Sequence, residues 1–305
     1  MVKRIALIGC GIWGLKILKE LVYLKASVDV FETDHSAEND IYEAGANRVF
    51  RGIPSNNNYD GIIIATPSET HRNILEQIIP LDIPVFLEKP LTTNLDDALA
   101  LERLKPDNVY LMHIWLYHPG IQLLGEIGRN GTLGKVLGIR STRANWTSPR
   151  KDTDSAWNLL PHDITIAKEI FGFIPKPKAA TAEFHDGVIR GLIALLGNNP
   201  YAVFEVSNRY ESKIREVRLH CEGGIALLAD EKTDHVSIIY GDANSEHDSL
   251  KTEKKGFDNT PPLRLELKEF LDYLDGGPAP RSSFTDGVEV VNTIHKLVEL
   301  SRNKL

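Results

Sequence analysis

Two basic side chains in this sequence lie in settings that suit proton transfer. Lys89 comes directly after an apolar run, and Pro90 stiffens the turn that follows it. Partial desolvation of a lysine there favours its neutral form, which can accept a proton. His162 follows Pro161 at a predicted helix start, and a neutral imidazole can take up and return a proton. The alternatives are a surface lysine and a histidine that only caps or packs.

A glycine motif indicates the first candidate binding site. The apolar run 5–8 leads into Gly9-Cys10-Gly11-Ile12-Trp13-Gly14, and a helical pattern follows from residue 15. In this setting Gly9 permits a tight turn, Gly11 lets the backbone approach a pyrophosphate, and Gly14 lets the helix pack on the strand. The helix N-terminus offers N–H groups to phosphate. The motif predicts a dinucleotide site that includes Ile12 and Trp13, with chance placement of glycines as the alternative.

An acidic residue ends the second apolar run, 28–31. Glu32 stands about 20 positions after the glycines, where such a residue is expected to bind the adenosine ribose 2′-hydroxyl. The next residues, Thr33-Asp34-His35, include no Arg or Lys to receive a 2′-phosphate. We therefore expect NAD as the cofactor, with NADP as the alternative. Asp34 is a second candidate for the ribose contact, and Glu32 could instead be a solvated loop residue.

Strand and helix patterns alternate over the first third of the chain. Predicted strands cover 5–8, 28–31, 61–65, 85–87 and 109–112, and predicted helices begin at 15 and cover 72–79 and 95–104. This alternation predicts a doubly wound parallel sheet, whose ligands bind at the carboxyl ends of the strands. Those ends carry the glycine motif, Glu32, Thr66-Pro67, the turn 88–90 and His113.

From residue 135 onward the pattern becomes that of a second, strand-rich domain. Predicted strands cover 136–139, 140–144, 188–196, 202–207, 216–220, 225–228 and 236–240. Their alternation predicts antiparallel strands with one buried face, and an exposed face or edge would invite subunit pairing. We expect the polar stretch 241–262 to be a mobile loop, and 288–298 to be a helix with an apolar stripe.

Composition excludes several classes of protein. The chain has 305 residues, 42% hydrophobic and 25% charged, which suits two globular domains. Its net charge of −7 argues against a nucleic-acid or anionic-membrane surface. No run approaches a membrane span, and the first apolar run is too short for a signal peptide. Cys10 and Cys221 have no paired spacing, so we expect a reducing cytoplasm and no metal site.

Four motifs, taken in order, resemble the glucose-fructose oxidoreductase / inositol dehydrogenase / rhizopine catabolism (Gfo/Idh/MocA) family. They are the glycine motif, Ile64-Ala65-Thr66-Pro67 with His71, Glu88-Lys89-Pro90, and Tyr117-His118-Pro119. Segments 131–136, 159–164 and 281–301 extend the resemblance over nearly the whole chain. It implies an N-terminal Rossmann domain at 1–118 and an α/β substrate domain at 119–305 with a large, open, mostly antiparallel sheet.

The resemblance also implies an activity and an assembly. Members of the family usually oxidise a hydroxyl of a sugar, a cyclic polyol or a nucleotide sugar with NAD or NADP. The second domain covers the nicotinamide and often forms the interface of a homodimer or homotetramer. The last helix, about 285–303, is expected to pack back on the Rossmann domain.

Residue roles follow from the same resemblance. It assigns Lys89 to the substrate hydroxyl and His162 to acid/base catalysis. Glu88 would orient Lys89 or the cofactor ribose, and Pro90 would shape the approach to the nicotinamide. Thr66 and Pro67 would lie near the pyrophosphate and ribose, while His71 would either contact the cofactor or pack. Further substrate-side candidates are Asp163, His113 beside Trp115, and the basic segment with Arg143, Asn145, Arg150 and Lys151, for which a solvated loop is the alternative.

One position departs from the family pattern. Asn158 stands where family dehydrogenases commonly carry Asp, four residues before the histidine. An amide can position a hydroxyl or His162, but it supplies no negative charge. Catalysis would then rest on Lys89 and His162, or on a substitute carboxylate from Asp152, Asp154 or Asp163. The rival hypothesis is a weak or inactive dinucleotide-binding sensor or scaffold.

Overall fold

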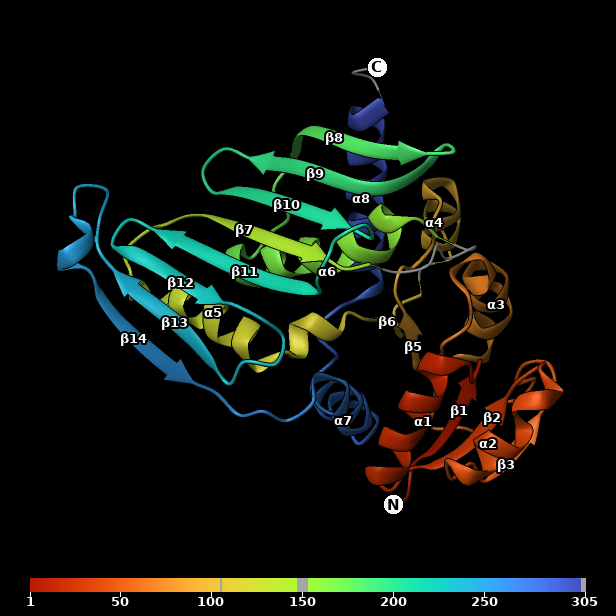
Figure 1. Ribbon diagram of the computed structural model, residues 1–305. Coiled ribbons are helices and arrows are strands. Elements are labelled where there is room, and N and C mark those ends of the chain that lie inside the picture. Colours follow the sequence, from red (N-terminus) through yellow and green to blue (C-terminus); the bar gives the residue numbers. More distant parts are fainter. Residues whose placement is uncertain (105, 147–152, 303–305) are drawn as a thin grey trace. The chain divides into compact units, whose positions relative to one another are not determined.

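Two compact units make up the chain. The computed structural model describes residues 1–104, 106–146 and 153–302 (Figure 1). Unit 1 comprises Met1–Ile114 and Pro261–Val291, and unit 2 comprises Trp115–Thr260 and the chain from Asn292 onward. The expected organisation placed everything after residue 118 in the second domain, whereas the segment from 261 to 291 is part of unit 1.

A six-stranded parallel sheet forms the centre of unit 1. Its strand order is β3-β2-β1-β4-β5-β6, the order of a dinucleotide-binding Rossmann sheet. All of its pairings are parallel, and the four central strands are almost completely buried. The bounds are β1 Arg4–Ile8, β2 Ser27–Phe31, β3 Arg48–Phe50, β4 Gly61–Ile64, β5 Val85–Glu88 and β6 Val109–Met112. The doubly wound parallel sheet is confirmed, and β3 is an addition to the expected strands.

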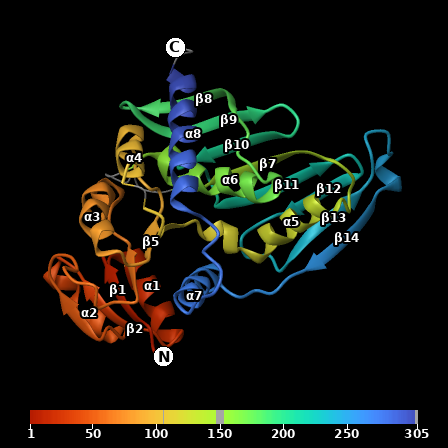
Figure 2. The same cartoon turned by 180° about the vertical axis from the view of Figure 1, so that it is seen from behind.

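Helices cover both faces of this sheet. They are α1 Ile12–Tyr23, α2 Glu38–Glu43, α3 His71–Ile78, α4 Leu95–Glu102 and α7 Pro262–Leu274, with short 3₁₀ helices η1 His35–Ala37, η2 Ser68–Thr70 and η3 Ile79–Leu81. Helix α7 lies beside α1 in both views of the ribbon (Figures 1 and 2). Its Phe270 stacks on Phe86 of β5 with 4.9 Å between ring centroids, so a segment distant in sequence completes the core.

An eight-stranded sheet forms unit 2, in the order β14-β13-β12-β11-β7-β10-β9-β8. Among the strand pairings of this second sheet, over its described residues, only β7–β10 is parallel and the others are antiparallel. The bounds are β7 Val136–Ala144, β8 Pro177–His185, β9 Val188–Gly197, β10 Tyr201–Ser207, β11 Ile214–Cys221, β12 Gly224–Leu228, β13 His235–Tyr240 and β14 Lys251–Gly256. The expected large, open and mostly antiparallel sheet is confirmed.

Strand β14 corrects the prediction of a loop at 241–262. It pairs antiparallel with β13 along its whole length, although its side chains are polar and largely exposed. An edge strand needs no apolar alternation to hold its ladder hydrogen bonds, and lysines at an edge disfavour pairing with another chain. The loop prediction is therefore wrong for β14 and for the short helix η5 His247–Ser249.

Two helices, α5 Pro119–Asn130 and α6 Ser155–Phe171, pack on one face of the unit 2 sheet (Figure 2). They follow the short helix η4 Ile114–Tyr117 in the chain, and the last helix, α8 Phe284–Arg302, begins in unit 1 and ends in unit 2. The start of α6 corrects a prediction, because His162 lies in the middle of the helix and not at its first turn. Asp154 caps the helix instead, since its Oδ1 accepts a hydrogen bond of 3.1 Å from the Trp157 N–H.

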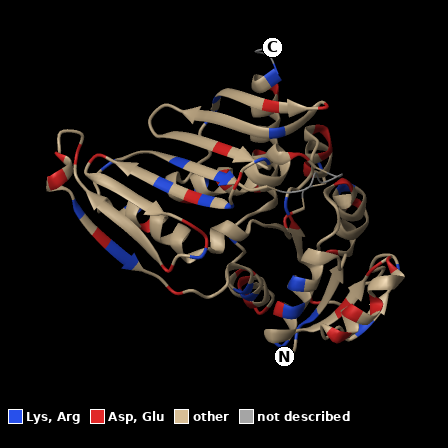
Figure 3. Ribbon diagram, viewed as in Figure 1, with Lys and Arg blue, Asp and Glu red and all other residues tan. Residues whose placement is uncertain are grey.

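Acidic and basic side chains are interspersed over both units (Figure 3). Within the described ranges, no helix has the length and apolar character needed to cross a membrane. The same residues contain no group of three metal-ligating side chains.

Candidate functional site

The turn between β1 and α1 is built for close approach of a ligand to the backbone. Gly9 has φ +85°, and a Cβ there would stand 2.7 Å from Thr66 Cγ2. A Cβ on Gly14 would stand 2.4 Å from the Gly9 carbonyl oxygen, whereas a Cβ on Gly11 would meet nothing within 4 Å. No side chain caps α1, and its first turn holds no acidic residue. This open, uncapped helix N-terminus fits a dinucleotide pyrophosphate.

The two residues inside the motif have different surroundings. Ile12 is 85% exposed, beside the open surface at Gly11. Trp13 is half-buried, and its indole N–H donates a hydrogen bond to Glu88 Oε1 at the end of β5. Lys16 lies over the Trp13 ring, 5.0 Å from its centroid. Trp13 therefore ties the glycine turn to the turn that carries Lys89.

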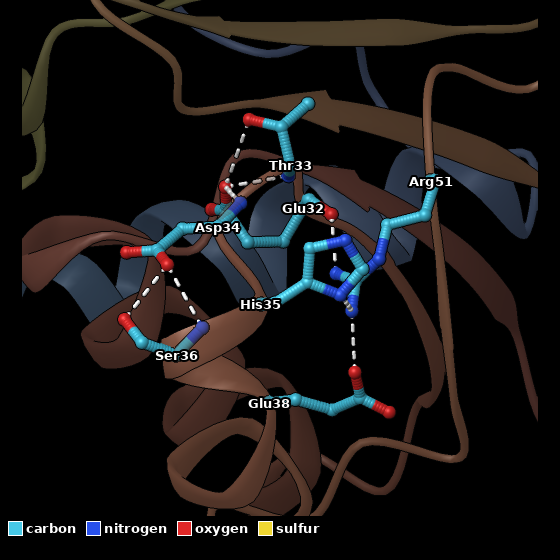
Figure 4. A network of polar contacts seen from close by, with 7 residues as sticks. All are labelled: Glu32, Thr33, Asp34, His35, Ser36, Glu38 and Arg51. Atoms are coloured by element: carbon cyan, nitrogen blue, oxygen red, sulfur yellow. Dashed lines mark hydrogen bonds and ion pairs between the residues drawn. The ribbon is translucent and has the colours of Figure 1, made fainter.

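Glu32 closes the turn after β2 with both of its carboxylate oxygens. Oε2 accepts from the Cys10 N–H at 2.7 Å, and Oε1 accepts from the N–H groups of Thr33 at 2.7 Å and Asp34 at 2.9 Å (Figure 4). The carboxylate thus lies against the glycine turn, as the ribose-binding prediction requires. Asp34 is engaged elsewhere, because it caps η1 through the N–H and hydroxyl of Ser36.

Cys10 is buried within the same turn, and its thiol is not a reactive group. Burial, aided by the charge of Glu32, raises the pKa of Cys10 to about 12. The protein therefore holds Cys10 as an uncharged thiol at neutral pH.

His71 joins two strand-end turns and presents no surface to a ligand. Its ring nitrogens lie 2.9 Å from the Pro90 carbonyl oxygen and 3.0 Å from the Thr66 carbonyl oxygen, and the side chain is completely buried. Burial lowers the pKa of His71, so its ring is neutral and donates to one of the two carbonyls. The expected cofactor contact of His71 is therefore corrected to a positioning role. His71 holds together two turns, one with Thr66 and Pro67 and the other with Lys89 and Pro90.

The turn after β5 places Lys89 at the carboxyl end of the sheet. Glu88 is 8% exposed, and its Oε2 accepts a hydrogen bond of 3.0 Å from the Lys89 backbone N–H. Because Oε1 of the same carboxylate accepts from Trp13, Glu88 fixes the backbone of Lys89 relative to α1. Lys89 itself is half-buried and Pro90 is buried. This contact is compatible with the first of the two expected roles of Glu88, the orientation of Lys89, which stays a prediction.

His113 does not have the expected substrate-side exposure. It follows β6, is 1% exposed, and its Nδ1 lies 2.7 Å from Ser282 Oγ. Residue 282 precedes α8, and the Leu111 N–H donates to the Ser282 carbonyl oxygen at 2.9 Å. His113 therefore fixes the return segment to the sheet of unit 1, and its assignment to the substrate is corrected.

In unit 2, helix α6 brings Asn158 and His162 onto one face. They are one helical turn apart, and both are half-buried on a helix whose other residues in this stretch are mostly buried. The predicted spacing of the pair is therefore realised as a shared face. Pro161 is buried inside the helix beside them.

Asp163 faces the core of unit 2. Its two carboxylate oxygens accept from Arg143 Nε at 3.0 Å and Nη2 at 3.1 Å, and the side chains are 0% and 2% exposed. Arg143 also lies over the Trp115 ring at 4.1 Å, and Trp115 stacks on His118 at 5.1 Å. A bidentate ion pair with no exposed surface leaves neither partner for a substrate. The substrate-side expectations for Asp163 and Arg143 are therefore corrected to a buried packing cluster, in which Trp115 is a core aromatic.

His118 of the Tyr117-His118-Pro119 motif is also structural. Its Nδ1 accepts from the Gly120 N–H at 3.1 Å and so caps α5, and its Nε2 lies 3.2 Å from the Glu231 carbonyl oxygen. Burial lowers the pKa of His118, which fits a neutral ring that accepts at Nδ1 and donates at Nε2.

Asn145 directly follows strand β7, near this cluster. Its Oδ1 accepts a hydrogen bond of 2.7 Å from Arg215 Nη2 on β11. Burial, together with the charge of Arg143, lowers the pKa of Arg215 to about 10. Asn145 is half-buried, so its amide N–H₂ remains a candidate for a substrate hydroxyl. Arg150, Lys151 and Asp152 lie outside the described residues.

Sequence reasoning missed two charged residues near the predicted site. Arg51 follows β3 and contacts the Glu32 turn, and Glu266 of α7 is buried beside Glu88. The sequence held a partial signal for Arg51, since it directly follows the apolar pair Val49-Phe50. It held none for Glu266, because a glutamate in an amphipathic helix is normally exposed.

Known proteins similar to this chain include several dehydrogenases. A profile described as "Oxidoreductase family, NAD-binding Rossmann fold" matches residues 3–110. Inositol 2-dehydrogenase of Arthrobacter sp. (strain FB24) is 26% identical over 162 residues, which are 48% of this chain and 47% of that protein. The chain thus spans about half the length of that relative, whereas the inositol 2-dehydrogenase of Rhizobium meliloti (strain 1021) is 19% identical over 79% of this chain and 78% of that protein. UDP-N-acetylglucosamine 3-dehydrogenase of Acidithiobacillus ferrooxidans is 27% identical over 298 residues, covering 93% of this chain and 92% of that protein.

Solved structures show the same fold over the full chain. Levoglucosan dehydrogenase, solved with NADH and levoglucosan, superposes with a TM-score of 0.86 at 15% identity and covers 100% of this chain and 98% of that one. The Acidithiobacillus ferrooxidans UDP-N-acetylglucosamine 3-dehydrogenase superposes with a TM-score of 0.83 at 19% identity and covers 99% of each chain. The predicted combination of a Rossmann domain with a second α/β domain is confirmed.

Proposed function

The chain belongs to the Gfo/Idh/MocA family of oxidoreductases, and from this premise we propose that it is an NAD-dependent dehydrogenase. Its reaction would transfer a hydride between the nicotinamide and a secondary hydroxyl of a sugar, a cyclic polyol or a nucleotide sugar. The observation that carries the proposal is the carboxyl edge of the unit 1 sheet. There the Glu32 carboxylate is bonded to the glycine turn that precedes the uncapped N-terminus of α1. The hydrogen bonds of Glu88 with the Trp13 indole and the Lys89 N–H join the same helix to the Lys89 turn.

Different residues at this edge would bind different parts of the dinucleotide. Gly11 leaves the α1 N-terminus open to the pyrophosphate, and Glu32 faces the adenosine ribose. Thr66 and Pro67 follow β4 on the same edge, next to Gly9. When bound, the cofactor supplies a hydride acceptor at its nicotinamide ring.

Two side chains would handle the substrate hydroxyl. Lys89 would donate a hydrogen bond to the hydroxyl oxygen and stabilise the negative charge that develops there. His162 would take the hydroxyl proton as a neutral imidazole and return it in the reverse direction. Asn158, on the same helix face, would orient His162 or a second hydroxyl through its amide.

The structure narrows the search for a substitute carboxylate. Asp163 is fully engaged with Arg143, and Asp154 caps α6. Burial raises the pKa of Asp154, which further weakens it as a source of negative charge. Asp152, the third candidate, lies outside the described residues. We propose that catalysis proceeds with Lys89 and His162 and needs no substitute carboxylate.

We assign the substrate to the sugar class, with nucleotide sugars favoured. The UDP-N-acetylglucosamine 3-dehydrogenase is 27% identical over 93% of this chain, whereas the inositol 2-dehydrogenase of Arthrobacter sp. aligns over 48% and that of Rhizobium meliloti aligns over 79% at only 19% identity. We further propose a cytoplasmic homo-oligomer that pairs through the large unit 2 sheet. Side chains on its uncovered face include the exposed apolar Ile193 and Leu195, which alternate along β9 with buried residues.

The test is cofactor reduction at 340 nm with a panel of UDP-sugars, free sugars and inositols. We expect NAD reduction with at least one UDP-sugar, and a loss of about 10²-fold or more in kcat when His162→Asn or Lys89→Met is introduced. Lys178→Met is the matched control, because Lys178 is exposed on β8 in unit 2. NADH binding by each variant, measured by titration calorimetry, distinguishes lost chemistry from lost folding.

Asn158 favours one rival, a dinucleotide-binding sensor without turnover. Both functions predict NADH binding, so only catalysis separates them. Turnover that disappears in Lys89→Met supports the dehydrogenase. NADH binding without reduction of NAD by any substrate, in the wild type and in Asn158→Asp alike, would establish the sensor.

A further inference from the structure

Arg51 lies next to the residue that is predicted to bind the adenosine ribose. Strand β3 pairs with β2 so that Phe50 stands beside Phe31, and the Glu32 N–H donates to the Phe50 carbonyl oxygen at 3.0 Å. Arg51, the residue after β3, therefore lies beside Glu32. Its Nη1 donates a hydrogen bond of 2.7 Å to the Glu32 carbonyl oxygen.

The guanidinium is held in this place by two further partners. Nη2 lies 2.7 Å from His35 Nδ1 and forms an ion pair with the Glu38 carboxylate (Figure 4). The Arg51 and Glu38 side chains are 35% and 40% exposed. An ion pair this exposed is weak, so Arg51 can exchange Glu38 for a stronger anion at little cost in free energy.

The charges around this turn oppose a phosphate. Glu32, Asp34 and Glu38 supply three carboxylates against the one guanidinium of Arg51. Hydrogen bonds from Ser36 lower the pKa of Asp34, which keeps it ionised. A ribose with free hydroxyls is compatible with this charge, whereas a 2′-phosphate is repelled by it.

We propose that Arg51 is a latent 2′-phosphate receptor, and that Glu38, by holding its guanidinium, sets the preference of this chain for NAD over NADP. The inference rests on the proposed function, since it concerns the dinucleotide that unit 1 would bind. Arginine is suited to the role because its planar guanidinium bonds a phosphate through two donors. The usual sequence rule examines only the residues after the second strand, and here the arginine comes from the end of the third.

Four proteins test the proposal: the wild type, Glu38→Gln, Arg51→Ala and the double variant. Titration calorimetry measures the Kd of NADH and of NADPH for each. We expect Glu38→Gln to tighten NADPH binding about tenfold, as one charge-assisted contact allows, and to change NADH binding by less than about twofold. The gain should disappear in the double variant, because it needs the guanidinium.

Asp40→Asn is the matched control. Asp40 is exposed on the same helix as Glu38, so the substitution removes the same charge two residues further on. A tightening of NADPH binding in Asp40→Asn equal to that in Glu38→Gln would show a general field effect and overturn the proposal. So would a gain that survives Arg51→Ala, or no gain at all in a protein that binds NADH normally. A wild type that binds neither dinucleotide would overturn the proposed function, and this inference with it.

Discussion

The three glycines of the first turn meet different physical requirements. Gly9 and Gly14 are needed by the fold, because a Cβ on either would collide with Thr66 or with the backbone of the turn itself. Gly11 is not needed by the fold, since its φ is −66° and open space lies where its Cβ would be. The fold requirement and the binding requirement can therefore be separated by substitution.

We predict that Gly14→Ala destabilises the protein while Gly11→Ala impairs only cofactor binding. The Gly14 Cβ would lie 2.4 Å from a backbone oxygen, an overpacking that costs about 1–3 kcal/mol. Gly11→Ala should change the free energy of unfolding by less than about 0.5 kcal/mol, as exposed substitutions do. It should weaken NADH binding about tenfold or more, because the methyl group stands where the pyrophosphate approaches. Urea unfolding and NADH titration measure the two effects, and equal losses of stability in both variants would contradict the prediction.

A second residue-scale prediction concerns Asn158. A carboxylate one turn from His162 favours the imidazolium and raises the pKa of the histidine in Asn158→Asp. Because the neutral imidazole is the base, the acidic limb of kcat/KM for alcohol oxidation should move to higher pH by about one unit. The variant should then be slower than the wild type near pH 6 and comparable near pH 9. The pH profile checks this, with His162→Asn as the control that lacks the limb, and an unmoved limb would remove His162 from the role of base.

At the scale of elements, helix α7 is joined to strand β5 by two side-chain pairs. Phe86 and Glu88 share a face of β5, and Phe270 and Glu266 are one turn apart on α7. The two phenylalanines stack, and the two carboxyls lie close enough to interact. Glu266 is completely buried, and within the described structure neither of its oxygens has a hydrogen-bond partner. Burial, with the charges of Glu88 and Glu269, raises the pKa of Glu266 well above its usual range, so the folded protein favours the protonated carboxyl.

This pair predicts a pH dependence of stability that Glu266→Gln removes. In the unfolded chain a glutamate ionises near pH 4.3, whereas Glu266 keeps its proton in the folded protein up to a much higher pH. Below about pH 4.3 the carboxyl is protonated in both the folded and the unfolded state, so its ionisation does not change the free energy of unfolding of the wild type. Above about pH 4.3 the unfolded carboxyl ionises and the folded one does not, so the free energy of unfolding falls by about 1.4 kcal/mol per pH unit until the folded carboxyl ionises too. Relative to the wild type, Glu266→Gln should therefore gain stability as the pH rises from about 4 to 7.

Urea unfolding of both proteins at several pH values measures the difference. Glu246→Gln, at an exposed position of unit 2, controls for the loss of a carboxyl as such. A difference in unfolding free energy that stays constant with pH would show that Glu266 is ionised in the folded protein.

The elements also show how far the sequence could be used to predict the structure. The strands of unit 1 are largely apolar, with Asp29 in β2 as an exception, and polar or glycine residues follow them closely. Five of them could therefore be located to within one residue at either end. The start of α6 could not, because Pro161 is typical of a first turn while Asp154 caps the helix. The roles of His71 and Asp163 were missed because their partners, Pro90 and Arg143, stand 19 and 20 positions away. Such pairings depend on the packing of whole elements and leave no local signal.

At the scale of the whole molecule, unit 1 is discontinuous. Its core contains Leu263, Leu267 and Phe270 of α7 together with side chains of β1, β2, β4, β5 and α1. The chain therefore completes its first unit only after it has made the sheet of the second. The hydrophobic core of this dinucleotide-binding fold is therefore completed by α7, although every residue of the predicted cofactor site lies within the first 90 residues.

We predict that residues 1–114 alone do not fold cooperatively, and that joining them to 261–291 by a flexible linker restores a cooperative transition. Burial of each of the three α7 side chains contributes about 1.5–3 kcal/mol, and together they match much of the roughly 5–15 kcal/mol that stabilises a domain. Urea unfolding followed by circular dichroism compares the two fragments. Phe270→Ala in the linked fragment is the control, and it should lose about 3–5 kcal/mol because it leaves a cavity against Phe86. If 1–114 unfolded cooperatively at the same urea midpoint as the linked fragment, α7 would be an accessory of unit 1 and not part of its core.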